Sequence, residues 1–264
     1  MDLNLTNKRA LVTGSTRGIG LATAIELANM GAEVIVSGRA QNKVDEAIAG
    51  IAEKVPGAKL QGIAADLGTA EGCKAVIGAV PDLDILVNNM GIYGPKEFEE
   101  TTDADWEEMF TVNVMSGVRL SRHYLPLLLK KDWGRIVFIS SESAIYIPKE
   151  MIHYGFSKSA QLAIARGMAQ LTSGTNITVN SVLPGPTWVE GAPARLEARA
   201  KEQGTTVEAL IQQTFDVRRP TSILRRYATT NEVANMIAYV CSPASSATNG
   251  AALRVEGGIV PTPF

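Results

Sequence analysis

Two kinds of hydrophobic pattern alternate along the chain. Short runs rich in Val, Ile and Leu are typical of buried parallel strands, and longer stretches with helical periodicity lie between them. The predicted strands are residues 9–14, 33–38, 59–67, 83–89, 134–141, 177–185 and 252–258. The predicted helices are residues 18–30, 41–54, 69–79, 103–130, 150–172 and 230–241. This alternation predicts an α/β fold, with a doubly wound parallel sheet of about seven strands and helices on both faces.

One segment interrupts the alternation. Residues 188–220 follow the sixth predicted strand and contain two short helical patterns but no strand pattern. Because insertions at the carboxyl end of a strand often bind ligands, we expect this one to be a substrate lid. Two Thr-x-x-Glu patterns predict helix starts with capping boxes, Thr205 with Glu208 and Thr229 with Glu232.

Composition restricts the class of protein. The chain has 264 residues, of which 45% are hydrophobic and 20% charged, and its net charge is −2. We therefore expect one domain over residues 1–264, with no nucleic-acid partner. No apolar run approaches the roughly 18 residues of a membrane span, and the N-terminal residues show no signal-peptide pattern, so we expect a cytoplasmic protein without a membrane partner. Two cysteines without metal-ligand spacing and only two histidines predict no metal site.

A glycine-rich loop follows the first predicted strand. Gly14, Gly18 and Gly20 lie between this strand and the next predicted helix. In this context glycines permit a tight turn and close approach of a pyrophosphate to the helix N-terminus. A glycine-rich turn without a ligand is the simpler alternative, but a strand before the loop and a helix after it favour a dinucleotide site.

The end of the second predicted strand bears on the choice of nucleotide. Its sequence "VSGRA" supplies Ser37 and Arg39 and no carboxylate for a ribose 2′-hydroxyl, and Arg17 adds a second guanidinium from the glycine loop. Two such groups suit a 2′-phosphate, although each alone would be read as a solvated surface arginine. The sequence thus favours NADP(H) and leaves NAD(H) open.

Several motifs in one order resemble the short-chain dehydrogenase/reductase family, in its smaller single-domain form. The motifs are "TGSTRGIG" (13–20), "DL" (66–67), "NNMG" (88–91), "VNV" (112–114), "ISS" (139–141), "YGFSK" (154–158), "LPGPT" (183–187) and "VEGG" (255–258). The resemblance covers nearly the whole chain and implies a single NAD(P)-binding Rossmann-fold domain. Family members are usually homotetramers or homodimers, which the resemblance implies here too.

The resemblance also implies the residues of the site. The implied catalytic residues are Asn113, Ser141, Tyr154 and Lys158. Ser141 is preferred to Ser140 because the family's serine lies thirteen residues before its tyrosine. The expected cofactor contacts are Gly14, Ser15, Arg17, Gly18, Ile19, Gly20, Ser37, Arg39, Asp66, Leu67, Asn89, Met90, Gly91, Tyr154, Lys158, Pro184, Gly185 and Thr187.

The chemistry of the pair supports these roles. Tyr154 and Lys158 are four residues apart and share a helix face. A neighbouring ammonium lowers the pKa of a phenol, so Tyr154 could exchange a proton with a carbonyl or alcohol oxygen. Ser141 would hydrogen-bond the same oxygen. By resemblance, Asn113 would hold a water that links Lys158 to solvent.

A few positions depart from the family pattern. Met90 stands where alanine is usual, and Val189 stands where a threonine is expected, with Thr187 two places earlier. Glu142, directly after Ser141, either lines the substrate pocket or points to solvent. Loop position makes Tyr93, Glu142, Tyr146 and Trp188 the candidate substrate-binding residues.

The resulting hypothesis is an NADP(H)-dependent oxidoreductase that interconverts a carbonyl compound, of ketone, aldehyde or 3-oxoacyl type, and an alcohol. The alternative is a nucleotide-binding regulator that keeps the fold without catalysis. A dehydratase or epimerase is a third reading, which the compact glycine motif disfavours. The sequence does not identify the substrate.

Overall fold

The computed structural model describes residues 1–263 and has a parallel sheet of seven strands in the order β3-β2-β1-β4-β5-β6-β9. The strands are β1 (Arg9–Val12), β2 (Glu33–Gly38), β3 (Leu60–Ala64), β4 (Ile85–Asn88), β5 (Gly134–Ile139), β6 (Ile177–Pro184) and β9 (Ala252–Val255). Every neighbouring pair in this sheet is parallel. The predicted fold class is confirmed.

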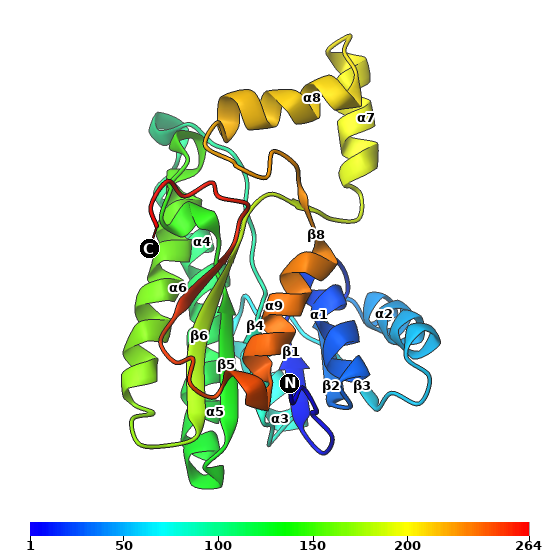
Figure 1. Cartoon of the computed structure of the whole chain (residues 1–264), viewed down its shortest axis with the longest axis vertical. Helices are drawn as coiled ribbons and strands as arrows, with labels where there is room; N and C mark the ends of the chain where they lie inside the picture. The colour runs from blue at the N-terminus through cyan, green and yellow to red at the C-terminus, as the bar shows by residue number, and fades with distance from the viewer. Residues whose placement is uncertain (264) are drawn as a thin grey trace.

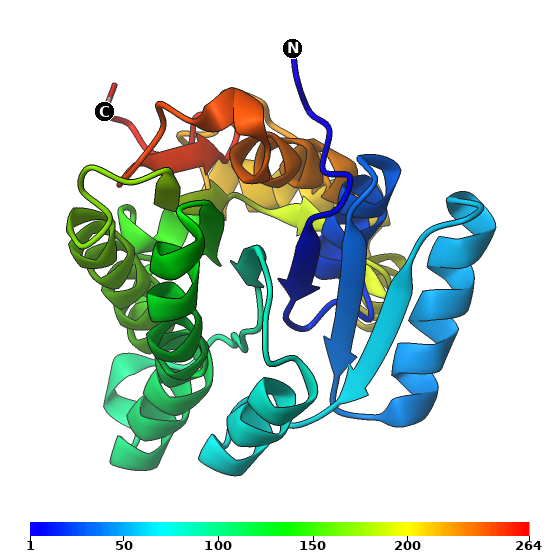
Figure 2. The same cartoon turned by 90° about the horizontal axis from the view of Figure 1, so that it is seen from below.

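Helices cover both faces of the sheet, as Figure 2 shows. One layer holds α1 (Gly18–Asn29), α2 (Gln41–Lys54) and α9 (Thr230–Cys241), and the other holds α3 (Ala70–Ala79), α5 (Ser116–Lys131) and α6 (Ile152–Gln170). Alternate strand residues supply the two cores, because successive side chains of a strand point to opposite faces. In β1, Ala10 and Val12 join the α1 and α9 core, whereas Leu11 joins the opposite core.

The strand order reverses at β1, which pairs with β2 on one side and β4 on the other. In doubly wound folds the ligand crevice opens at the carboxyl edge of the sheet at this reversal. The loops that follow β1, β4, β5 and β6 therefore meet at one edge, and these loops carry the glycine motif, Asn89, Ser141 and Gly185.

The predicted helix over residues 103–130 is interrupted. It consists of α4 (Asp103–Met109), a π-helical turn (Phe110–Met115) and α5. Wide turns of this kind are frequent at functional sites, and this one carries Asn113, whose side chain is buried. A hydrophobic pattern cannot show such a turn, because the apolar residues on either side keep a helical spacing.

Several other predicted boundaries shift, among them the following two. The strand predicted over residues 59–67 ends at Ala64, and the helix predicted over residues 150–172 begins as a 3-10 turn (Lys149–Met151) before α6. A hydrophobic pattern defines the middle of a helix or strand better than its ends.

The insertion stands beyond the carboxyl edge of the sheet, at the top of Figure 1. It contains α7 (Ala192–Glu202) and α8 (Val207–Gln213), as the two helical patterns predicted. The expectation that it holds no strand is wrong at its first residue, because Trp188 belongs to β7 (Thr187–Trp188), which pairs with β8 (Ala228–Thr229). This small ribbon links the entry of the insertion to the segment that follows it.

Of the two predicted capping boxes, one is confirmed. Thr229 and Glu232 cap α9 reciprocally. At α8 the capping residue is Thr206 and not Thr205, because the Thr206 side chain accepts a hydrogen bond from the amide of Ala209. Glu208 then lies one position too early in the helix to complete a box.

Candidate active site

The conformation of the glycine loop depends on two glycines and on a side chain from another loop. Gly14 and Gly18 both have φ of 60°, a left-handed conformation that glycine adopts without strain. The side-chain amide of Asn89, from the loop after β4, donates to the carbonyls of Thr13 at 2.8 Å and Gly14 at 3.1 Å. A predicted cofactor residue thus fixes the shape of the loop.

Ser15 and Ser37 have the same internal role. Both are buried, and the Ser15 hydroxyl donates to the Val12 carbonyl at 2.7 Å while it accepts from the Ser37 amide at 3.0 Å. The Ser37 hydroxyl accepts from the Gly14 amide at 3.3 Å. The structure therefore places these two hydroxyls inside the loop, between β1 and β2.

Two cations lie near the glycine loop, at the ends of β1 and β2. Arg17 and Arg39 are exposed, and neither forms an ion pair within residues 1–263. Unpaired guanidinium groups at the ends of β1 and β2, with no carboxylate at the end of β2, fit a dinucleotide that carries a 2′-phosphate. Of the two expected cofactor contacts that follow β3, Asp66 is exposed and Leu67 is buried.

The insertion also reaches this loop. The Glu190 carboxylate accepts a hydrogen bond from the Gly18 amide at 2.7 Å. That amide begins α1, where the helix dipole favours an anion. The start of the insertion is therefore anchored on the glycine loop.

A cavity of about 640 Å³ adjoins the carboxyl ends of β4, β5 and β6. Ser141, Tyr154 and Lys158 all line it, together with predicted cofactor residues from three loops. Those lining residues are Ile19, Asn89, Gly91, Pro184, Gly185 and Thr187. Residues that the sequence places far apart are thus brought into one space.

Lys158 is buried, and two of its three donors are engaged. Its ammonium nitrogen donates to the Ile139 carbonyl at 2.8 Å and to the Gln161 side chain at 3.2 Å. Burial lowers the pKa of Lys158 to about 7, because a charged amine is poorly solvated there. Gly91 lies close to this group, since a Cβ at that position would lie 3.4 Å from the Lys158 nitrogen and 3.3 Å from the Asn113 side-chain oxygen.

Tyr154 is half-buried, with the Lys158 nitrogen 5.7 Å from its ring centre. Burial raises the pKa of the Tyr154 phenol above its ordinary value, Ser141 lowers it and Glu142 raises it further. The expectation that Lys158 lowers this pKa is not met by the protein's own groups. The Lys158 nitrogen donates to Ile139 and Gln161 instead of to the Tyr154 hydroxyl.

Asn113 faces the same region from the π-helical turn. Its side chain accepts from the Ile92 amide at 2.7 Å and donates to Ser157 at 2.9 Å. Its backbone carbonyl accepts from the Gln161 side chain at 2.6 Å, so that Gln161 bridges Asn113 and Lys158 directly. The water that Asn113 is expected to hold between Lys158 and solvent stays a prediction. Gln161 was missed, although an amide in the small-residue stretch "SKSAQLAIA" was a signal.

Two of the four predicted substrate residues lie on the cavity. Tyr93 lines it and packs edge-on against Tyr154 with ring centres 6.1 Å apart, and Glu142 lines it beside Ser141. Trp188 instead packs against Tyr227, at 5.4 Å between ring centres. Neither Trp188 nor Tyr146 is among the residues that line the cavity.

Apart from Glu142, the charged residues of the lining were not among the predicted substrate-binding residues. The insertion contributes Arg195, Arg199, Arg218 and Arg219, and the loop after Ser141 contributes Glu150. Arg219 is buried and pairs with Glu142, with 3.1 Å between its Nε and the carboxylate. The dipeptide "RR" at the end of the insertion was the available signal.

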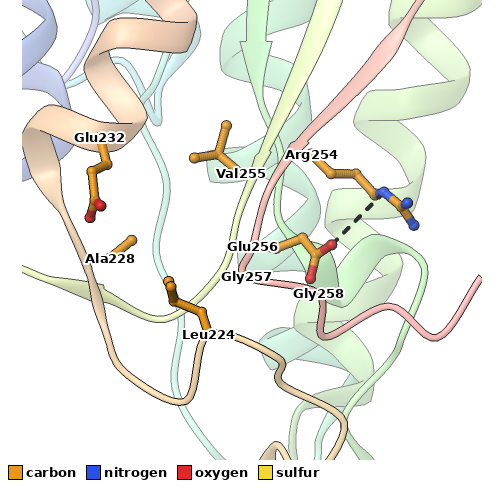
Figure 3. Close-up of a pocket in the computed structure, with 8 residues that line it drawn as sticks. All are labelled: Leu224, Ala228, Glu232, Arg254, Val255, Glu256, Gly257 and Gly258. Carbon is orange, nitrogen blue, oxygen red and sulfur yellow. Dashed lines mark ion pairs between the residues drawn. The ribbon is translucent and has the colours of Figure 1, made fainter. Parts of the chain in front are cut away.

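A second, smaller cavity lies at the end of β9, away from these residues. Figure 3 shows Arg254 and Glu256 on one side of it and Glu232 on the other. These charges are already satisfied by the protein. The Glu256 carboxylate accepts from the amides of Ile259 and Val260, and Glu232 pairs with Arg226. The cavity contains none of the predicted catalytic residues.

The described residues contain no cluster of three or more His, Cys, Asp or Glu side chains arranged to hold a metal ion. Cys73 and Cys241 are buried free thiols. Within the same residues, no helix is both long and apolar enough to cross a membrane.

Comparison with known proteins identifies the family. The short chain dehydrogenase family model matches residues 8–199. The chain belongs to the short-chain dehydrogenase/reductase family. It is therefore an oxidoreductase of the class that acts on alcohol and carbonyl groups with a nicotinamide cofactor.

Relatives of several kinds share nearly the whole chain. An uncharacterized oxidoreductase of Bacillus subtilis is 48% identical, with 98% of this chain and 99% of the relative covered. The 3-oxoacyl-[acyl-carrier-protein] reductase of Aquifex aeolicus is 31% identical, with 98% and 100% covered. The L-sorbose reductase of Gluconobacter frateurii, solved with NADPH and L-sorbose, has a TM-score of 0.93 at 29% identity, with 99% and 100% covered.

Proposed function

We propose that this short-chain dehydrogenase/reductase is an NADP(H)-dependent enzyme that interconverts a carbonyl compound and an alcohol. The observation that carries the proposal is the shared cavity. Ser141, Tyr154 and Lys158 line one space with residues of the glycine loop and of the loops after β4 and β6. A nicotinamide dinucleotide supplies the hydride in such chemistry.

The choice of NADP(H) rests on Arg17 and Arg39. Both guanidinium groups lack ion pairs within the described residues, and no acidic side chain ends β2. The L-sorbose reductase structure with NADPH and a second structural relative, a putative 2-deoxy-D-gluconate 3-dehydrogenase with bound NADP, support the same choice. NAD(H) is the weaker alternative.

Tyr154 is the proposed proton donor and acceptor. With a raised pKa, its phenol is protonated at neutral pH and can give its proton to a carbonyl oxygen. Ser141, whose hydroxyl also acts on Tyr154, would contact the same oxygen. Lys158, with a pKa of about 7, can hold or release a proton near neutrality, and Gln161 connects it to Asn113.

The test is a carbonyl panel followed by loss of NADPH absorbance. The panel contains L-sorbose, a 3-oxoacyl thioester and small ketones, which represent the chemistry named for the relatives. We expect turnover of at least one member. Tyr154→Phe should lower kcat by about 10²–10⁴ while NADPH binding, followed by fluorescence, stays nearly unchanged. Tyr146→Phe, off the cavity, is the matched control.

The alternative is a regulator that binds the nucleotide and does not turn over. NADPH binding with no consumption across the whole panel would favour it. Equal turnover by wild type and Tyr154→Phe would instead remove Tyr154 from the mechanism.

We also propose that the enzyme is cytoplasmic and assembles as a homotetramer or homodimer. Light scattering after size exclusion tests the assembly. A monomer at micromolar concentration would contradict it.

A further inference from the structure

Glu142 sits in an unusual place for a carboxylate. It directly follows Ser141 and is 4% exposed, in the wall of the catalytic cavity. Burying a charge is costly unless it is paired and hydrogen-bonded. Both of its oxygens are in fact engaged, one by the Ser141 hydroxyl at 2.5 Å and the other by Arg219 at 3.1 Å.

Arg219 comes from the far end of the insertion. It lies 77 positions after Glu142 in the chain, and its side chain is 8% exposed. Its guanidinium also lies 3.7 Å from Glu150 and donates to the Arg218 carbonyl at 2.9 Å. The pair therefore joins the insertion to the loop that carries Ser141.

The hydrogen bond between Ser141 and Glu142 determines whether the Ser141 hydroxyl can donate a hydrogen bond to a ligand or only accept one. A hydroxyl has one proton to donate and two lone pairs that accept. In this structure the proton goes to Glu142, and one lone pair accepts from the Ser143 amide at 3.1 Å. The position that remains can accept a hydrogen bond, from the Tyr154 phenol or from a ligand, and cannot donate one.

This matters because the two forms of the substrate differ at the reacting oxygen. An alcohol has a proton to donate, whereas a carbonyl oxygen only accepts. A serine that only accepts suits the alcohol. To serve the carbonyl, Ser141 must turn its proton away from Glu142.

We propose that Glu142 and Arg219 are positioning residues. While Arg219 of the insertion is paired with Glu142, the carboxylate holds the Ser141 hydroxyl proton, and the site thereby favours binding of the alcohol form of the substrate. This inference rests on the proposed function for its second half, the preference for alcohol. The first half, the coupling of the insertion to Ser141, concerns the protein alone.

Substitution of the pair tests the coupling without any substrate. Arg219→Gln leaves the Glu142 carboxylate buried without its cation, which strongly destabilises the contact. We expect faster hydrogen exchange in residues 207–219, measured by mass spectrometry on the full chain. Glu142→Gln should do the same to a smaller extent, and the double variant should exchange no faster than Arg219→Gln alone.

Controls separate this effect from general unfolding. Arg218→Gln is the matched control, because Arg218 is exposed and forms no ion pair within residues 1–263. Its exchange should equal that of wild type. Arg219→Lys keeps the charge and serves as a second variant if Arg219→Gln does not fold. Its exchange rate in residues 207–219 should fall between those of wild type and Arg219→Gln. Unchanged exchange in both Arg219 variants, or additive effects in the double variant, would overturn the coupling.

Steady-state kinetics test the preference for alcohol, with the carbonyl that the panel identifies and its corresponding alcohol. In Glu142→Gln the amide oxygen can still accept from Arg219, and the amide nitrogen can donate to Ser141, which frees the serine proton. We expect KM to rise for the alcohol and fall for the carbonyl, each by about threefold to tenfold, the worth of one hydrogen bond.

A purely structural role would not produce this split. The ratio of the two kcat/KM values is fixed by the equilibrium constant, so a damaged site changes both together. KM values that move in the same direction, or not at all, would refute the positioning role. If wild type turns over no carbonyl, the proposed function fails, and the exchange experiment still decides the coupling.

Discussion

The edge of the sheet and the insertion face the same cavity and are held in place by different forces. At the sheet edge the loops are continuous with buried strands, and side chains such as Asn89 and Ser15 bond to backbone carbonyls. In the insertion only Ala200, Leu210, Phe215 and Arg219 are buried between residues 188 and 220. Its two ends are anchored by polar contacts, Glu190 on the Gly18 amide and Arg219 on Glu142.

The difference supports the proposal that the insertion is an adaptable lid over a rigid site. Segments with few buried apolar contacts open at low free energy, whereas the sheet opens only with global unfolding. Loops that close over substrates belong to the first kind. The sheet edge would then set the geometry of proton transfer, and the insertion would set which molecules enter.

The largest expected effect concerns the sheet edge. Arg17→Ala combined with Arg39→Ala should weaken NADPH binding by about a hundredfold or more, because two charge-assisted hydrogen bonds are lost. NADH, which lacks the 2′-phosphate, should bind nearly as before. Fluorescence titration measures both. Arg122→Ala, an exposed arginine of α5, is the control. Equal losses for both nucleotides would contradict the NADP(H) assignment.

Two glycines in α3 test how tightly this helix packs against its surroundings in the sheet region. A Cβ on Gly72 would lie 1.9 Å from the Asp66 carbonyl oxygen, whereas one on Gly78 would meet nothing within 4 Å. Gly72→Ala should lower the free energy of unfolding by about 1–3 kcal/mol. Gly78→Ala should raise it by about 0.5–1 kcal/mol, as expected for an exposed helix position. Urea unfolding that gives both variants the same sign would refute this.

Lys158 predicts a pH dependence of stability. Its pKa is about 7 in the fold, against about 10.4 in the unfolded chain. Between these values the unfolded state holds a proton that the folded state lacks, so the free energy of unfolding rises with pH. The slope is about 1.4 kcal/mol per unit. Urea unfolding at pH 7, 8 and 9 should show this slope in wild type relative to Lys158→Met. Parallel profiles would show that the lysine stays charged.

The sequence predicted most of the sheet and its covering helices and less of the insertion. Strands such as β5 and β6 are continuous apolar runs, and the residues that follow parallel strands must meet at one edge. The placement of Ser141, Tyr154 and Lys158 around one cavity needed nothing more than the motif order.

What the sequence did not predict depends on contacts between distant residues. The bridge from Gln161 to Asn113 joins positions 48 apart, and the pair of Arg219 with Glu142 joins positions 77 apart. No local pattern marks either one. The π-helical turn at residues 110–115 was not predicted either, because the hydrophobic residues on both sides of it keep an ordinary helical spacing.

The smallest expected effect lies in the insertion. The Thr206 side chain caps α8 by accepting from the Ala209 amide, and its neighbour Thr205 is not the capping residue. Thr206→Ala should lower the local stability of α8 by about 1 kcal/mol, and Thr205→Ala should leave it unchanged. Hydrogen exchange of the α8 amides measures the local effect, and urea unfolding measures the global one. Because few residues of the insertion are buried, the local loss should appear without an equal global loss. Equal losses would mean that the insertion unfolds only with the sheet, and the contrast between a rigid edge and an adaptable lid would then not hold.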